Sequence, residues 1–343
     1  MKILLTAEFD QSSIKELEDL FEITYKGWFV EERVLEEDEL VNLIKDKEIF
    51  ITSYDNVTRR VIEAGNKLKL IACTRANPVN IDVKAANEKG IKVIYTPGRN
   101  SDTTAEFTIA MMLCIARKIP MMYQDLKNGK FLSDNKVENK TVKGLKQDVT
   151  WALGGDSPYI LYKGVQLHGK SLGIIGYGNI GKKVGNIAKT FGMNLLIYDP
   201  YAKVPEVQEE NEEFCTLEYV LKNSDFITCH CSVTDDTRKS INKEAFDLMK
   251  KSAYFINISR GAIVDESALI EALRGNKIAG AAVDVFESEP LDKNHPFISE
   301  LDNIVITAHI GGATWDVITN HSKMIVSDIK RFKNNEKLIY EIN

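Results

Sequence analysis

Apolar and polar positions follow two alternating patterns over the first hundred residues of the chain. Short β-rich runs are separated by charged stretches with helical spacing, such as 11–20 and 82–89. Strands that alternate with crossovers of this length build βαβ units, so the pattern predicts a parallel sheet. The predicted strands of this part are 3–6, 49–52, 70–73 and 93–95.

The later part of the chain repeats this alternation between two longer helices. Residues 105–119 (AEFTIAMMLCIARKI) are too long and too apolar for a strand and contain neither Gly nor Pro, which predicts a buried helix. Residues 314–335 predict an amphipathic helix, with Ile318, Met324, Ile325, Ile329 and Phe332 roughly on one face. Between them we expect a helix at 179–191 and strands at 171–175, 194–198, 225–229, 253–258, 278–283 and 303–307.

The stretch 127–169 is the least regular part of the chain. Gly154, Gly155 and Pro158 punctuate a loop that carries Trp151 and other aromatic residues. Loops of this length inside a compact domain tend to be functional or disordered. A packed arm and a plain surface insertion both remain open.

Composition narrows the class of protein. A chain of 343 residues with 44% apolar residues can bury two cores, which favours two domains. The net charge is -6 and the lysines alternate with acids, so we expect no nucleic-acid partner. The five cysteines form no CxxC pair, which suggests neither a disulfide framework nor a metal site.

The chain shows no targeting or membrane signal. The N-terminus, MKILLTAEFD, passes from a short apolar run straight into acids and is too short for the apolar region of a signal peptide. No run approaches about 18 consecutive apolar residues, the length of a membrane span. We therefore expect a cytoplasmic protein without a membrane partner.

A glycine-rich turn lies near the middle of the chain. The run SLGIIGYGNIG, residues 171–181, places Gly176, Gly178 and Gly181 between an apolar strand and a helix. In a dinucleotide-binding turn the first glycine makes the tight turn, the second lets the backbone approach the pyrophosphate, and the third lets helix and strand pack closely. A tight turn that binds nothing is the structural alternative.

Two further features of this region favour a dinucleotide. The N–H groups at the helix start, around Asn179 and Ile180, would face the phosphates. Asp199 ends the next strand, where an acid accepts hydrogen bonds from the adenosine ribose and repels a 2′-phosphate. The expected cofactor is therefore NAD rather than NADP.

Polar residues also follow three of the later strands. Ligands of parallel α/β sheets lie beyond the carboxyl ends of the strands, so these residues are candidates for chemistry. They are Ser259 and Arg260 after Ile258, Asp284, Glu287 and Glu289 after Val283, and His309, Gly311 and Gly312 after Thr307. Taken singly, each also has a structural explanation, such as a surface ion pair, a loop carboxylate or a helix cap.

Together, an arginine, a carboxylate and a histidine beside a nicotinamide suggest one reaction. The guanidinium can hold a substrate carboxylate in a bidentate fork and polarise an adjacent carbonyl. The imidazole can exchange the proton that accompanies hydride transfer, and a neighbouring carboxylate would orient the ring and favour its protonated form. This combination suits a 2-hydroxy acid dehydrogenase.

Five ordered motifs carry a resemblance to a known family. They are NIDVKAANEKGIKVIYTPGRNSDTTAEFTIAMML, GIIGYGNIG, NISRGAIVDE, AAVDVFESEP and AHIGG. On these motifs the chain resembles the D-isomer-specific 2-hydroxyacid dehydrogenases, and within them the phosphoglycerate dehydrogenase-like branch. The resemblance implies the catalytic residues: Arg260 looks like the substrate-binding arginine, Glu289 like the acid that partners the histidine, and His309 like the proton donor.

The resemblance also implies the ligand contacts. Asp284 resembles the residue that holds the nicotinamide carboxamide. The other implied cofactor positions are Gly176, Gly178, Asn179, Ile180, Gly181, Asp199, Ile258, Ser259, Arg260, His309, Gly311 and Gly312. With Arg260, the loop residues Arg75, Ala76 and Asn77 stand where family members present backbone amides to the substrate carboxylate, often with Gly in place of Asn77.

The implied fold is α/β, with two Rossmann- or flavodoxin-like domains and an active site between them, usually in a homodimer. The substrate domain would be discontinuous, formed by residues 1–102 and 318–343, with an NAD-binding Rossmann domain of residues 103–317 inserted.

The substrate stays open. The stretch TSYDNVT, residues 52–58, has no arginine where one type of phosphoglycerate dehydrogenase binds phosphate. Hydroxypyruvate or glyoxylate reduction, and a non-catalytic NAD(H)-sensing protein on the same scaffold, are the alternatives.

Overall fold

The computed structural model describes residues 1–132, 155–203 and 211–342. The chain forms two compact units: unit 1 comprises Met1–Asn100 and Ala313–Asn343, and unit 2 comprises Ser101–Gly312. The domain boundaries predicted from the sequence lie between residues 102 and 103 and between residues 317 and 318. Trp151 and Gly154, from the irregular stretch 127–169, lie outside the described residues.

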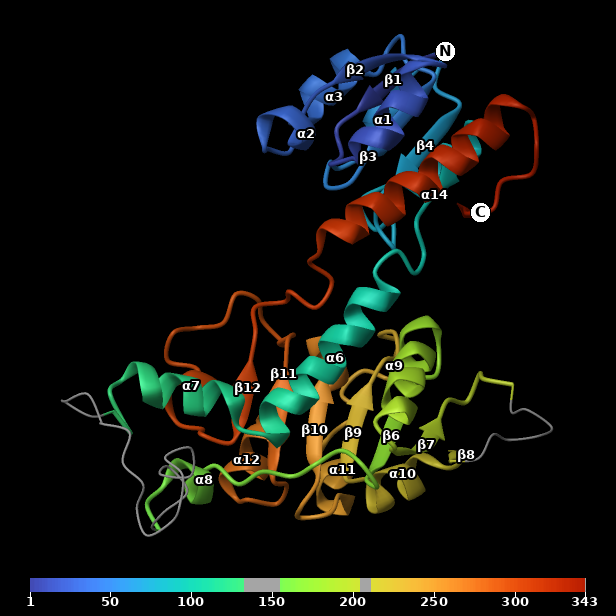
Figure 1. Ribbon diagram of the computed structural model, residues 1–343. Coiled ribbons are helices and arrows are strands. Elements are labelled where there is room, and N and C mark those ends of the chain that lie inside the picture. Colours follow the sequence, from blue (N-terminus) through green and yellow to red (C-terminus); the bar gives the residue numbers. More distant parts are fainter. Residues whose placement is uncertain (133–154, 204–210, 343) are drawn as a thin grey trace. The chain divides into compact units, whose positions relative to one another are not determined.

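Unit 1 is built on a six-stranded sheet in the order β13-β5-β4-β3-β1-β2 (Figure 1). All of its strand pairs are parallel except that of β13 with β5. The strands are β1 (Lys2–Leu5), β2 (Glu22–Tyr25), β3 (Ile49–Thr52), β4 (Leu70–Cys73), β5 (Lys92–Ile94) and β13 (Glu341–Ile342). The helices are α1 (Gln11–Glu18), α2 (Trp28–Glu31), α3 (Glu37–Leu43), α4 (Arg59–Ala64), α5 (Val83–Glu88) and α14 (Trp315–Lys333).

Both faces of this sheet are buried, as a parallel sheet between helices requires. On β3, Ile49 and Ile51 pack in one apolar cluster with residues of α1 and α14. Phe50 points to the other face and packs with residues of α3, α4 and α5. This two-sided burial explains why β3 and β4 read as uninterrupted apolar runs in the sequence.

The C-terminal helix α14 forms as predicted, but its buried face is partly polar. His321, Ser322 and Asp328 are buried beside Ile325 and Ile329. The Asp328 carboxylate accepts the backbone N–H groups that lead into β13, those of residues 339 and 340. An amphipathic pattern counts only apolar positions, so it missed these polar anchors.

Unit 2 is built on a seven-stranded sheet, wholly parallel, in the order β12-β11-β10-β9-β6-β7-β8. The strands are β6 (Ser171–Ile175), β7 (Asn194–Tyr198), β8 (Glu212–Phe214), β9 (Phe226–Cys229), β10 (Tyr254–Asn257), β11 (Gly280–Val283) and β12 (Ile304–Ile306). The helices are α6 (Ser101–Ala116), α7 (Ile119–Lys127), α8 (Pro158–Leu161), α9 (Asn179–Thr190), α10 (Leu217–Asn223), α11 (Lys243–Leu248), α12 (Glu266–Arg274) and α13 (Pro296–Ser299). These two sheets, one wholly parallel and one parallel except for β13, confirm the predicted α/β class.

The helices of unit 2 cover both faces of its sheet. Helix α6 contacts α9, β10, β11 and β12 on one face, where Figure 1 shows it lying across the sheet. Residues of α10, α11 and α12 pack in the apolar cluster of the other face. The strand order reverses between β6 and β9, and such a switch point is where parallel α/β sheets bind ligands.

The predicted helix 105–119 is correct in kind but wrong in extent. Helix α6 begins at Ser101 and ends at Ala116, and α7 starts at Ile119. Lys118 between them has a left-handed backbone with φ 54°, and Pro120 fits the first turn of the next helix. The apolar run therefore spans two helices.

We expect Phe50→Ala to destabilise unit 1 strongly. Phe50 is 0% exposed, and emptying such a site lowers the free energy of unfolding by about 3–5 kcal/mol. Urea unfolding can be followed by tryptophan fluorescence, because Trp28 and Trp315 belong to this unit. Leu20→Ala, at a 37% exposed position, is the control. Equal stability of the two variants would contradict the packing described above.

Candidate active site

The glycine turn after β6 requires glycine at two of its three positions, Gly176 and Gly181, and leaves open space at the third, Gly178. Gly176 has φ +94°, and a Cβ there would lie 2.7 Å from the backbone N of Cys231. A Cβ at Gly181 would lie 2.2 Å from the carbonyl oxygen of Gly176, so only glycine lets α9 approach the strand. Around Gly178 no atom lies within 4 Å of a Cβ position. This open space before the N-terminus of α9 fits the close approach of a pyrophosphate.

Asp199 lies at the end of β7 and bonds to the same turn. Its Oδ2 accepts the N–H of Tyr177 at 2.7 Å, and its Oδ1 accepts the N–H of Tyr201 at 2.8 Å. Its carboxylate thus helps to fix the glycine turn, which the sequence also predicts to lie beside the ribose. That contact stays a prediction.

Three neighbouring strands bring the other candidates to one edge of the unit 2 sheet. Strands β10, β11 and β12 are adjacent, and their carboxyl ends carry Arg260, Asp284 and His309. A Cβ at Gly261 would lie 1.9 Å from the carbonyl oxygen of Phe286, and one at Gly311 would lie 2.7 Å from Cγ2 of Ile258. The loops after the three strands therefore lie in direct contact.

His309 and Glu289 form a hydrogen-bonded pair. Nδ1 of His309 lies 2.7 Å from Oε2 of Glu289, and their side chains are 47% and 37% exposed. Burial raises the pKa of Glu289, but hydrogen bonds from His309 and from the Phe286 N–H, with the charges of His309 and Arg260, outweigh it and hold this pKa below its usual value. The ionised carboxylate fixes one nitrogen of the ring and leaves Nε2 for proton exchange.

Asp284 fixes the backbone that carries His309. This carboxylate is 1% exposed and accepts the Thr307 hydroxyl at 2.6 Å, the Ile310 N–H at 2.9 Å and the Gly311 N–H at 2.7 Å. The N–H of His309 bonds to the Asp284 carbonyl at 2.8 Å. His309 thereby adopts φ 55°, a left-handed conformation uncommon outside glycine. The predicted contact of Asp284 with a carboxamide stays a prediction.

Arg260 presents a largely free guanidinium at this edge. Its Nη1 donates to the carbonyl of Ser259 at 2.6 Å, and the contact is exposed. Asn257, the last residue of β10, fixes the loop, because its Nδ2 donates to the Arg260 carbonyl at 3.0 Å and its Oδ1 accepts the Ser259 hydroxyl at 2.7 Å. The sequence patterns did not single out Asn257 or Thr307 as part of the site. Each is a polar residue in or at the end of an apolar strand, and this feature could have marked them.

An apolar cavity of about 610 Å³ adjoins the histidine pair. Besides Glu289 and His309 it is lined by Phe286, Pro290, Leu291, Ile298, Ile306, Thr307 and Ala308. Most of the side chains that line this cavity are therefore apolar.

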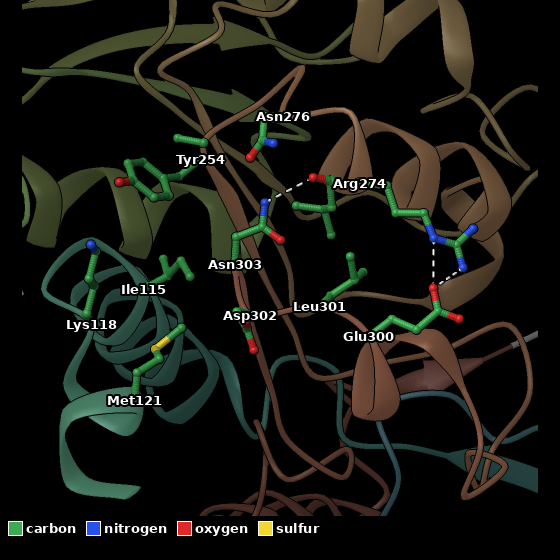
Figure 2. Close-up of a pocket in the computed structure, with 12 residues that line it drawn as sticks. Ile115, Lys118, Met121, Tyr254, Arg274, Asn276, Glu300, Leu301, Asp302 and Asn303 are labelled. Atoms are coloured by element: carbon green, nitrogen blue, oxygen red, sulfur yellow. Dashed lines mark hydrogen bonds and ion pairs between the residues drawn. The ribbon is translucent and has the colours of Figure 1, made fainter. Parts of the chain in front are cut away.

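A second cavity, of about 510 Å³, lies at the opposite edge of the sheet. Figure 2 shows Tyr254 at the start of β10 and Asn303 just before β12 among the residues that line it, with Arg274 bonded to Glu300. Ligands of parallel sheets bind at the carboxyl edge, so this amino-edge cavity is not a candidate catalytic site.

The remaining predicted residues are placed as follows. Ile258 is buried and Ser259 is half-buried beside the Arg260 loop, and Gly312 ends unit 2. The predicted substrate loop belongs to unit 1, where Ala76 and Asn77 are exposed and the Arg75 guanidinium lies 5.7 Å from the ring centre of Tyr54. Within residues 1–132, 155–203 and 211–342, no group of three His, Cys, Asp or Glu side chains could hold a metal ion.

A parallel sheet that carries a glycine turn at one strand end and a histidine–carboxylate pair at another is suited to hydride transfer. This combination defines the class of nicotinamide-dependent oxidoreductases. No helix in the described parts of the chain is long and apolar enough to cross a membrane.

Comparison with known proteins gives the family. Residues 109–311 match the pattern described as D-isomer specific 2-hydroxyacid dehydrogenase, NAD binding domain. A glyoxylate reductase of Pyrococcus horikoshii is 34% identical over 336 residues, which cover 98% of this chain and 93% of that protein. A D-3-phosphoglycerate dehydrogenase of Methanocaldococcus jannaschii is 37% identical over 338 residues, and the match spans 98% of this chain but only 58% of that longer protein.

A solved structure agrees with these matches. The D-lactate dehydrogenase of Aquifex aeolicus, solved with NAD and lactic acid, aligns with a TM-score of 0.70 and 27% identity over 97% of this chain and 96% of that one. The chain therefore belongs to the D-isomer-specific 2-hydroxyacid dehydrogenases, and its cofactor is NAD. The predicted family, class of enzyme and cofactor are confirmed.

We expect Asp199→Ala to relax the discrimination against NADPH. Removing this charge removes its repulsion of a 2′-phosphate, so the ratio of kcat/KM for NADPH to that for NADH should rise roughly tenfold or more. Asp199→Asn, which keeps an acceptor for the Tyr177 N–H, separates the charge effect from collapse of the turn. Asp247→Ala, which breaks surface ion pairs of the same unit, is the control. An unchanged cofactor ratio would show that Asp199 does not read the ribose.

Proposed function

We propose that this protein interconverts a D-2-hydroxy acid and its 2-oxo acid, with Arg260 anchoring the substrate and the His309–Glu289 pair exchanging the proton. The observation that carries these roles is the 2.7 Å contact between Nδ1 of His309 and Glu289 at the strand edge that also carries Arg260. In the same proposal unit 1 is the substrate-binding domain.

When bound, NADH supplies the hydride to C2 of the 2-oxo acid. The residues fitted to hold it are the glycine turn, the first N–H groups of α9 and Asp199, with Ile258, Ser259, Gly311 and Gly312 as further proposed contacts. Among the described residues of unit 2, the Arg260 guanidinium donates a hydrogen bond only through Nη1. Its other N–H groups are therefore available to a substrate. Its planar fork matches a carboxylate and would hold the 2-oxo group in one orientation.

His309 supplies the proton to the carbonyl oxygen that becomes the hydroxyl. Its Nδ1 is bonded to Glu289, so the proton leaves from Nε2 and is replaced from solvent through this 47% exposed side chain. The Glu289 carboxylate stabilises the imidazolium before transfer and orients the ring. In the direction of oxidation, the same Nε2 takes the hydroxyl proton.

The similar proteins support two alternative substrate classes. A phosphoglycerate dehydrogenase-like activity is supported by the match to the methanogen enzyme, and hydroxypyruvate or glyoxylate reduction by the match to the archaeal glyoxylate reductase. We propose a phosphoglycerate dehydrogenase-like enzyme as the first candidate. A homodimer, as the resemblance implies, and a location in the cytoplasm complete this proposal. Light scattering tests the homodimer.

We expect His309→Asn to abolish most turnover while NADH binding is retained. Asn tolerates the left-handed backbone at this position, so the turn should persist. Loss of a general acid should slow the reduction of hydroxypyruvate, glyoxylate, pyruvate or 3-phosphohydroxypyruvate by about 10²–10⁴-fold. NADH affinity, measured by fluorescence titration, should stay within about twofold, because the proposed cofactor contacts of the glycine turn and Asp199 are unchanged.

His168→Asn is the matched control, because His168 is an exposed histidine of the same unit. Near-normal turnover of His309→Asn would refute the proposed proton donor. A wild-type protein that binds NADH but reduces none of these acids would favour an NAD(H)-sensing role instead.

We expect Glu289→Gln to slow the reduction. The Glu289 carboxylate orients the His309 ring and stabilises the imidazolium, so its replacement by a neutral amide should lower kcat/KM by about tenfold or more. Glu287→Gln is the control, because Glu287 pairs with Lys239 at 2.8 Å and lies two residues before Glu289. Equal kcat/KM values for Glu289→Gln and the wild type would contradict the assigned role of Glu289.

A further inference from the structure

The loop that carries Glu289 is bonded on both sides of that residue to one carboxylate outside the loop. Glu266 is the first residue of α12, and its side chain is half-buried. Its Oε2 accepts the backbone N–H of Glu287 at 3.1 Å, and its Oε1 lies 3.1 Å from Nε2 of His295. The first bond uses the backbone of Glu287, so Glu287→Gln leaves it intact. Glu266 thus holds the segment 287–295 near both of its ends.

The contacts of His295 assign the proton of its ring. Nδ1 accepts the backbone N–H of Phe297 at 3.3 Å and so caps the short helix α13. An imidazole nitrogen that accepts a hydrogen bond carries no proton, so Nε2 carries it and donates to Glu266. The ring also packs edge-on against Phe297, with 4.6 Å between the ring centres. Both nitrogens are therefore engaged, and a change of tautomer would break a bond on either side of the ring.

Residue 266 must accept two hydrogen bonds to satisfy these partners. The Glu287 N–H and the His295 Nε2–H are both donors, and they bond different oxygens of the Glu266 side chain. A carboxylate accepts both, whereas an amide offers one oxygen and turns its own N–H groups toward the other donor. The negative charge also lies in the first turn of α12, where the helix dipole stabilises it. The arrangement therefore requires an acid at this position rather than glutamine.

The segment 287–295 determines where the Glu289 carboxylate lies. Oε1 of Glu289 accepts the Phe286 N–H at 3.1 Å, and Oε2 lies 2.7 Å from Nδ1 of His309. Phe286 is 8% exposed and belongs to an apolar cluster of unit 2, so packing holds the start of the loop. The bonds of Glu266 hold the part that follows. A hydrogen bond weakens steeply when its partners move out of line, so the Glu289 contact to His309 depends on this part of the loop.

We propose that Glu266, acting with His295, is a positioning residue for proton exchange, because it holds the loop in which Glu289 reaches His309. This inference rests on the proposed function, since it acts through the Glu289–His309 pair. All of the groups that it uses belong to unit 2. Loss of the Glu266 carboxylate misplaces Glu289 without removing it.

We expect Glu266→Gln to lower kcat for the best-reduced 2-oxo acid of the panel above by roughly 5- to 50-fold, because small misplacements of a reacting group are costly. KM for NADH should stay within about twofold, since the proposed cofactor contacts are unchanged. Glu218→Gln is the matched control, because Glu218 is a glutamate in the first turn of α10 and pairs with Lys222 on the surface of the same unit. Equal kcat values for Glu266→Gln and Glu218→Gln would overturn the proposal.

A double variant distinguishes positioning from a general loss of structure. Glu289→Ala leaves no carboxylate to position, so adding Glu266→Gln to it should lower kcat by less than about twofold further. A loss of structure would instead multiply the effects of the two single variants. Multiplied losses would therefore overturn the proposal.

Substitutions of His295 test the second half of the arrangement. His295→Gln offers a donor to Glu266 and an acceptor to the Phe297 N–H, and should keep kcat within about threefold of the wild type. His295→Leu has neither and should lose about as much as Glu266→Gln. Should Glu266→Gln not fold, Glu266→Asp, with both oxygens on a shorter side chain, and His295→Leu apply the same test. Equal kcat values for His295→Leu and the wild type would contradict the role of His295.

Amide hydrogen exchange keeps this inference separate from the catalytic proposal. The Phe286 N–H donates to Glu289, so exchange in the fragment 284–295 reports whether the carboxylate stays in place. Exchange there should be about fivefold faster or more in Glu266→Gln than in the wild type, and unchanged in Glu218→Gln. Faster exchange in a protein without turnover would retain the positioning and reject the catalytic roles. Unchanged exchange in Glu266→Gln would reject the positioning, whatever the turnover.

Discussion

The edge of the unit 2 sheet that carries His309 depends on one buried carboxylate, that of Asp284. A carboxylate with 1% exposure must be satisfied by hydrogen bonds, and Asp284 obtains them from the turn that follows β12. Closing that turn forces His309 into its left-handed conformation and directs the ring toward Glu289. The hydrogen-bonded pair of His309 and Glu289 therefore follows from a structural demand at the end of β11.

The parallel sheet of unit 2 supplies the other half of the arrangement. Its strands are all parallel, so residues far apart in the sequence, such as Asp199 after β7 and Arg260 after β10, lie along the same edge of the sheet. The glycine turn sits at the strand order's point of reversal, between β6 and β9. The turn lies near the middle of the chain because unit 1 is discontinuous. Residues 1–100 form most of unit 1 before unit 2 begins, and residues 313–343 complete it.

Much of this fold could be predicted from periodicity because the central strands are buried on both faces. Strands β6 and β7 begin and end where the apolar runs do. Strands β2, β8 and β13 were missed: each lies at a sheet edge, is short and has few buried side chains, so no apolar run marks it. The break between α6 and α7 was missed because the apolar pattern continues across Lys118.

The proposed site could be named from the sequence where polar residues follow a strand directly, as with Arg260, Glu289 and His309, and their roles stay a prediction. Contacts between distant segments could not be predicted in this way. Arg99 and His321 lie 222 positions apart, and only the fold brings the guanidinium to 2.8 Å from Nδ1 of the ring. Asn257 was hidden for a related reason: its function is to hold the backbone of other residues.

The most direct test of hydride transfer follows the label in the product. With NADH deuterated at C4 of the nicotinamide and a 2-oxo acid from the panel above, mass spectrometry and chiral chromatography identify the hydroxy acid formed. The account predicts a D-2-hydroxy acid with deuterium at C2 and a proton from solvent on its oxygen. An L product, or a D product whose C2 hydrogen comes from solvent, would contradict it.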